Sequence, residues 1–243
     1  MELGEIEVIE VINYDNGSKK VIGPLVISAI LIGIYFIGMI IWALLILPKG
    51  AQTKEAQTFA ALGGSLVNAG VFIVCLGILF QKMPFEPKAN ISLRTKGKYF
   101  LIGGALLLGA NITINSFYML INHVPEKQDL VQRISNIPTE YQAMIILGTG
   151  LIIPLIEEII FRGFLYNSFT SFIKNGKYKK LIAAVLTASI FALVHLEFKI
   201  HILIPLFIMG LIFNYVYEKT GSITVCSGVH ALNNMMMLSV LYL

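Results

Sequence analysis

The sequence predicts an all-α fold: a multi-span transmembrane helical bundle of about seven helices with a polar cavity in the membrane. Of its 243 residues, 56% are hydrophobic and 13% are charged, whereas soluble domains carry about 25% charged residues. The chain also divides into long stretches without a charged residue, and most of them approach the roughly 20 residues that a helix needs to cross a bilayer. We therefore expect one integral membrane domain over residues 1–243.

The charge-free stretches place each expected helix in turn. The seven spans are predicted at about 21–47, 57–80, 99–122, 141–173, 181–197, 200–217 and 222–242. The polar segment 122–142 is expected to be an outer loop. Span four contains Pro154, where a helix could begin afresh or kink. Gly221 is expected to end span six, and Ser222 is expected to cap span seven.

Basic residues are unevenly shared between the predicted loops. They concentrate in alternate loops, at Lys19–Lys20, 82–98, 174–180 and Lys219. By the positive-inside rule this side is cytoplasmic, which predicts a multi-pass protein of the cell membrane with its N-terminus in the cytoplasm. This topology accounts for the formal net charge of +4 without a nucleic-acid partner.

Neither a cleavable signal peptide nor a disulfide framework is expected from this sequence. The first eighteen residues are acidic and lack the basic start of a cleavable signal, so none is expected. Cys75 and Cys226 both fall in predicted spans and have no paired spacing, so the sequence predicts neither a disulfide nor a cysteine metal site.

Three charged residues interrupt span four, in the stretch "IIPLIEEIIFRGF". A charge inside the bilayer costs at least about 2.5–3.5 kcal/mol, so such residues are by default functional. Glu158 and Arg162 are one helical turn apart, and we expect a buried ion pair that supports the site structurally. Glu157 points about 100° away from Glu158, so its carboxylate is left available for chemistry.

Other polar residues are predicted at the same depth. Glu157 and His195 lie equally far from the tight turn at 174–180, so they should stand level in an antiparallel helical hairpin. His230 and Asn234 are also one turn apart and project from one face of span seven, at a comparable depth. We therefore expect four polar groups from three helices to share one layer of the membrane.

This set of residue types fits two kinds of hydrolytic chemistry. Glu157 and His195 could activate a water molecule, while His230 and Asn234 could donate hydrogen bonds to the oxyanion formed at a carbonyl group. Alternatively, Glu157, His195 and His230 could hold a catalytic zinc ion (Zn2+) with water as the fourth ligand. The sequence contains no HExxH motif, and a site without a metal cofactor is the favoured expectation.

Three short motifs resemble those of a known family. "EEIIFRG" (157–163), "FALVH" (191–195) and "HALNN" (230–234) are similar to the ordered motifs EExxxR, FxxxH and HxxxN. These motifs belong to the CAAX-protease and bacteriocin-processing family of intramembrane proteases, which includes type II CAAX prenyl endopeptidases. The resemblance covers about 145–240, a protease-like core, and leaves the spans within 21–122 as additional helices.

The resemblance implies an activity and a role for each residue. Glu157 and His195 would activate water, and His230 and Asn234 would stabilise the oxyanion; members have also been called metalloproteases. The implied substrate is a lipidated or hydrophobic peptide or protein, such as a CAAX tail or a small bacteriocin-like peptide, cleaved in contact with membrane lipids.

Two other classes of protein are compatible with a polar layer in the membrane. A non-catalytic bacteriocin-immunity or binding protein would use these residues only to bind or to pack. A proton-coupled transporter would use them as a proton relay, but it would favour matching repeats in both halves of the chain. The first three spans contain no acidic or basic residue, which argues against such a matching half.

Overall fold

The computed structural model describes residues 91–122, 146–173, 176–195 and 199–239, with a few helical positions between 26 and 34. Throughout these residues the secondary structure is helical and contains no strand, which confirms the all-α class. Apart from those few positions, the predicted spans at 21–47 and 57–80 lie outside the described residues, as does the predicted outer loop after residue 122. The structure thus describes five of the seven predicted helices.

Two of the helices have the length and apolar composition of membrane spans. Helix α3 runs over Leu93–Asn122 and α9 over Ile200–Thr220. Helix α3 begins six residues before the predicted span, because Ser92 caps its first turn by accepting a hydrogen bond from the Thr95 N–H at 3.2 Å. The added turns carry Lys96 and Lys98, which the hydropathy pattern had excluded from the span.

Span four is one long helix with two π-helical stretches. Its consecutive segments are η1 (Gly148–Ile152), α6 (Ile153–Glu158), η2 (Ile159–Tyr166) and α7 (Asn167–Phe172). The backbone stays helical at each junction, so the chain runs through the charged residues as predicted and does not begin afresh at Pro154. Proline has no N–H for the usual i−4 bond, and the wider turn before it, where the Ile153 N–H reaches the Gly148 carbonyl, accommodates this gap.

The last three helices are α8 (Lys179–Leu193), α9 and α10 (Ile223–Ser239). Gly221 ends α9 in the left-handed region at φ 58°, and its N–H bonds to the Tyr217 carbonyl at 2.7 Å, which confirms the predicted helix stop. The Ser222 hydroxyl accepts a hydrogen bond from the Val225 N–H at 3.4 Å, as expected for a helix cap.

Helix α8 ends earlier than the predicted span five, and this changes the position of His195. The span was expected to continue to 197, but the helix stops at Leu193 and His195 lies in the following turn. The His195 N–H bonds to the Ala192 carbonyl at 3.3 Å, which is the tighter i−3 bonding typical of a helix end. His195 is consequently exposed rather than buried within a helix.

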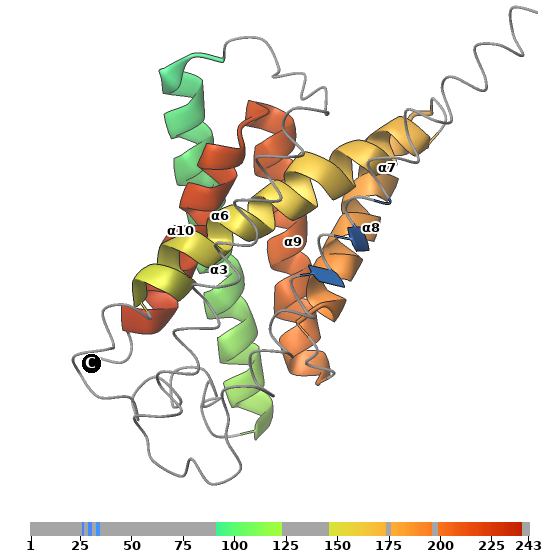
Figure 1. Cartoon of the computed structure of the whole chain (residues 1–243). Helices are drawn as coiled ribbons and strands as arrows, with labels where there is room; N and C mark the ends of the chain where they lie inside the picture. Colours follow the sequence, from blue (N-terminus) through green and yellow to red (C-terminus); the bar gives the residue numbers. More distant parts are fainter. Residues whose placement is uncertain are drawn as a thin grey trace, which may run out of the picture.

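The helices pack so that span four crosses the others. Figure 1 shows the long helix with α6 and α7 lying diagonally across α9 and α10, with α3 beside α10. It contacts α10 through η1 and α6, and it contacts α8 through η2 and α7. The buried core follows this crossing and is rich in aromatic side chains, among them Phe161, Phe191 and Phe213. The part of span four that contains Arg162 therefore lies where this long helix meets α8, α9 and α10.

Helices α8 and α9 approach closely at Gly210. A Cβ atom added at Gly210 would lie 2.9 Å from both Cα and Cβ of Ala188, which is too close for carbon atoms. We expect Gly210→Ala to lower the free energy of unfolding by about 1–3 kcal/mol through overpacking, measured by denaturant unfolding in detergent. Gly109→Ala on α3, where nothing lies within 4 Å, is the matched control and should show no such loss. Equal stability of both variants would contradict this account.

Candidate active site

Glu158 and Arg162 form the predicted ion pair at the centre of the bundle. The Arg162 Nη1 atom lies 3.0 Å from Glu158 Oε1, and both side chains are completely buried. The Arg162 Nη2 group donates a second hydrogen bond to the Gly210 carbonyl, also at 3.0 Å. At Gly210, α9 therefore both packs closely against α8 and supplies the carbonyl group that accepts a hydrogen bond from Arg162.

Aromatic rings surround the Arg162 guanidinium. Its central carbon lies 5.0 Å from the ring centres of Phe191 and Phe213 and 5.8 Å from that of Phe161. Cation–π attraction strengthens when water is excluded, as it is around a completely buried side chain. One carboxylate, one carbonyl and three rings together replace the hydration of this cation.

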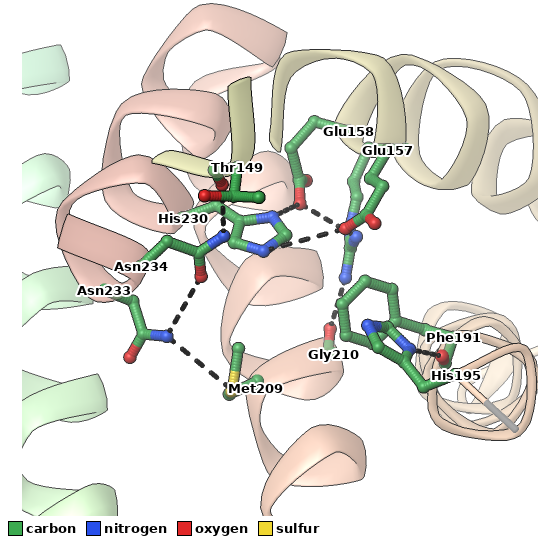
Figure 2. Close-up of polar contacts among 11 residues, drawn as sticks. Thr149, Glu157, Glu158, Phe191, His195, Met209, Gly210, His230, Asn233 and Asn234 are labelled. Atoms are coloured by element: carbon green, nitrogen blue, oxygen red, sulfur yellow. Dashed lines mark hydrogen bonds and ion pairs between the residues drawn. The ribbon is translucent and has the colours of Figure 1, made fainter. Parts of the chain in front are cut away.

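His230 lies between the two glutamates. Its Nδ1 atom is 3.0 Å from Glu158 Oε1, and its Nε2 atom is 3.7 Å from Glu157 Oε2 (Figure 2). An ionised carboxylate can only accept, so the contact with Glu158 places a proton on Nδ1. The imidazole also stacks on Phe213 with ring centres 4.6 Å apart. Glu158 therefore holds both Arg162 and His230 in place.

The two adjacent glutamates differ in environment. The Glu158 side chain is fully buried, whereas that of Glu157 is 15% exposed. Glu157 takes no part in the Arg162 pair and turns its carboxylate toward the Nε2 edge of His230, as Figure 2 shows. Glu158 is therefore anchored to Arg162 as predicted, and Glu157 lies outside that pair, but the imidazole that contacts Glu157 is His230 rather than the expected His195.

His195 stands at the edge of this group. Its Nδ1 atom lies 2.7 Å from the Phe191 carbonyl, which fixes the proton on Nδ1 and leaves Nε2 as an acceptor in the neutral ring. Its ring packs edge-on against that of Phe191, whose other neighbours include His230. Within the described residues, no hydrogen bond or ion pair joins His195 to Glu157. Their approach across a shared water molecule, at about 3–6 Å, stays a prediction.

Asn234 belongs to a chain of amide groups that the sequence analysis missed. Its Nδ2 group donates to the Thr149 carbonyl in η1 at 3.0 Å, and its Oδ1 atom accepts from Asn233 Nδ2 at 3.4 Å. Asn233 Oδ1 in turn accepts from Asn111 Nδ2 on α3 at 2.8 Å. Two signals could have revealed these residues: the first asparagine of "HALNN", and the amide of Asn111 in the middle of span three.

The structure gives no assembled metal site for the zinc alternative. Across the described ranges, no three His, Cys, Asp or Glu side chains are grouped so that they could hold a metal ion. Glu157 and His230 are neighbours, but His195 lies in the turn beyond Phe191. As arranged here, these three residues do not fit a zinc ion.

Comparisons with known proteins agree with the class that the fold and site define, a helical membrane protein with a buried polar site. Residues 139–236 match the sequence profile of the family described as type II CAAX prenyl endopeptidase Rce1-like. These residues include all three motifs. This match and the relatives below support a relationship to the CAAX-protease and bacteriocin-processing family.

Two curated bacterial proteins are similar to the chain. The UPF0177 protein YxdF of Lactococcus lactis is 33% identical over 86 residues, which cover 35% of this chain and 44% of that protein. The membrane-embedded CAAX protease MroQ of Staphylococcus aureus is 26% identical over 196 residues, covering 76% of this chain and 74% of that protein. The second alignment is longer than the family match, so this similarity extends beyond residues 139–236. No solved structure matches the chain.

Proposed function

We propose that the protein is an intramembrane endopeptidase that hydrolyses a peptide bond with a water molecule activated by glutamate and histidine. The observation that carries this proposal is the Glu157–His230–Glu158 arrangement. A partly exposed carboxylate faces one nitrogen of an imidazole, while a buried carboxylate holds the other nitrogen. The arrangement lies within the residues that match the protease family.

Glu157 is the proposed general base. Its carboxylate is the part of the Glu157–Glu158–Arg162 cluster that solvent can reach, so a water molecule can bind there. Glu157 takes a proton from this water, and the oxygen attacks the carbonyl carbon of the scissile bond. The same proton then passes to the leaving amine as the carbon–nitrogen bond breaks. The acceptor Nε2 atom of His195 is available to orient the water, in line with the family resemblance.

His230 and Asn234 are the proposed partners of the oxyanion. Donation from His230 Nε2 requires a second proton on the ring, because the first proton is on Nδ1. An imidazolium at His230 would make the group of Glu157, Glu158, Arg162 and His230 electrically neutral. Donors placed in advance where charge develops account for a large share of such catalysis. Asn234 has one N–H committed to Thr149 and a second N–H left to donate.

The proposed substrate is a lipidated or hydrophobic peptide or protein that reaches the site from the membrane. Two helices are suited to crossing a bilayer, and one relative is named a CAAX protease. A prenylated CAAX tail and a hydrophobic peptide leader are the two candidates, and both have an apolar arm that can partition into lipid. We further propose that the chain crosses the cell membrane several times with its N-terminus in the cytoplasm, in line with its basic loops.

Incubation of the purified protein with a prenylated CAAX peptide and with a hydrophobic leader peptide tests the activity. We expect cleavage of at least one of them, detected by mass spectrometry of the products, and we expect cleavage to survive treatment with a metal chelator. Stoichiometric zinc that cannot be removed without loss of activity would overturn the metal-free mechanism. Specific binding of the peptides without cleavage would instead favour an immunity or binding protein.

Replacement of Asn234 with alanine tests the oxyanion role. We expect Asn234→Ala to lower turnover by about 10²–10³-fold, the usual effect of removing one oxyanion donor. The change should fall mainly on kcat in steady-state kinetics, because the donor acts when charge develops on the carbonyl oxygen. Ser239→Ala, at the exposed end of the same helix, is the control and should keep the activity of the unaltered protein. An unchanged kcat for Asn234→Ala would remove Asn234 from the mechanism.

A further inference from the structure

The amide chain that ends at Asn234 begins outside the part of the protein that matches the protease family. Asn111 lies on α3, and the family match starts at residue 139. From Asn111 the hydrogen bonds run to Asn233, from Asn233 to Asn234, and from Asn234 to the Thr149 carbonyl. The chain thus joins α3, α10 and η1, three separate helical segments, beside the proposed active site.

The direction of these hydrogen bonds is fixed at the Thr149 end. A backbone carbonyl can only accept, so Asn234 must turn its amide nitrogen toward Thr149. The Asn234 Oδ1 atom then faces Asn233, which must present its own nitrogen. Consequently Asn233 Oδ1 faces α3, where a donor is required, and Asn111 Nδ2 supplies it at 2.8 Å.

We propose that Asn111 is a positioning residue for Asn234. Without a donor on α3, the Oδ1 atom of the buried Asn233 side chain would lose its hydrogen-bond partner, so Asn233 would no longer be held in its present orientation. A rotated Asn233 would point its oxygen at the oxygen of Asn234 and so disfavour the present orientation of that side chain. Asn111 therefore holds Asn234 with its N–H groups in place, through Asn233 and without touching the substrate.

The catalytic part of this inference rests on the proposed function, and kinetics test it. Asn111→Leu removes the donor at similar volume, and Asn115→Leu is the matched control, because Asn115 is exposed one turn further along α3. We expect Asn111→Leu to lower kcat about three- to twenty-fold, the range for one hydrogen bond between helices in a membrane, with KM unchanged. Asn115→Leu should leave kcat unchanged.

A double variant separates positioning from a purely structural role. If Asn111 acts through Asn234, Asn111→Leu should cause no further loss of kcat in the Asn234→Ala background. A bond that only ties α3 to α10 would reduce activity equally in both backgrounds, and that result would overturn the proposal.

A measurement that does not need activity keeps this inference separate from the proposed function. In protein labelled with ¹⁵N-asparagine, the side-chain signals of Asn233 and Asn234 can be assigned from their loss in the corresponding alanine variants. We expect Asn111→Leu to shift both signals and Asn115→Leu to shift neither. An unmoved Asn234 signal in Asn111→Leu would overturn the proposal even if no peptide substrate were cleaved.

Discussion

Replacement of Glu157 with glutamine is expected to lower peptide cleavage by about 10²–10⁴-fold, the usual contribution of a general base. Glutamine keeps the shape of the side chain but cannot take a proton from water. The partial exposure of Glu157 and its absence from the Arg162 pair predict that folding survives the change. The measurement is a steady-state cleavage assay, with the thermal unfolding midpoint recorded on the same sample.

A shorter carboxylate gives the matched control for this prediction. Glu157→Asp keeps a base but draws it back by one methylene group, so it should retain more activity than Glu157→Gln. If Glu157→Asp is more active than Glu157→Gln, the activity lost in Glu157→Gln comes from the missing base rather than from a changed position of the side chain. Full cleavage by Glu157→Gln would contradict the mechanism.

Replacement of Glu158 with glutamine is expected to act on stability first. The change would leave the Arg162 guanidinium buried among three rings without its carboxylate. It would also weaken the contact that holds His230 Nδ1. Removal of one partner from a buried ion pair costs about 3–5 kcal/mol, so we expect a sharp fall in the yield and in the unfolding midpoint of the purified protein.

The control for Glu158→Gln is an ion pair at the surface. Lys180 contacts Glu218, but the Lys180 side chain is 68% exposed, and exposed pairs contribute only about 0–1 kcal/mol. Lys180→Gln should therefore leave yield and unfolding almost unchanged. Wild-type stability of Glu158→Gln would mean that water or another group compensates Arg162.

Much of the fold could be predicted from local sequence because the determining interactions are local. The absence of charge defined the helices, a glycine in the left-handed region ended α9, and a serine capped α10. The ion pair of Glu158 with Arg162 is also local, since residues one turn apart face each other on any helix. The inequality of the two glutamates follows from the same helical geometry.

The tertiary structure decided the contacts that join different helices. Sequence spacing places His230 and Glu157 at similar depths, but it does not determine how each helix is rotated about its axis. Packing sets that rotation, and it brings His230 rather than His195 against both glutamates. The amide chain from Asn111 depends on the same packing, because its members lie on different helices. Hydropathy also did not mark the end of α8, because the apolar sequence continues past Leu193, where the helix ends. His195 therefore lies in the turn beyond the helix. The sequence by itself thus determined the helices and the polar residues they carry, whereas packing between the helices decided which of those residues meet.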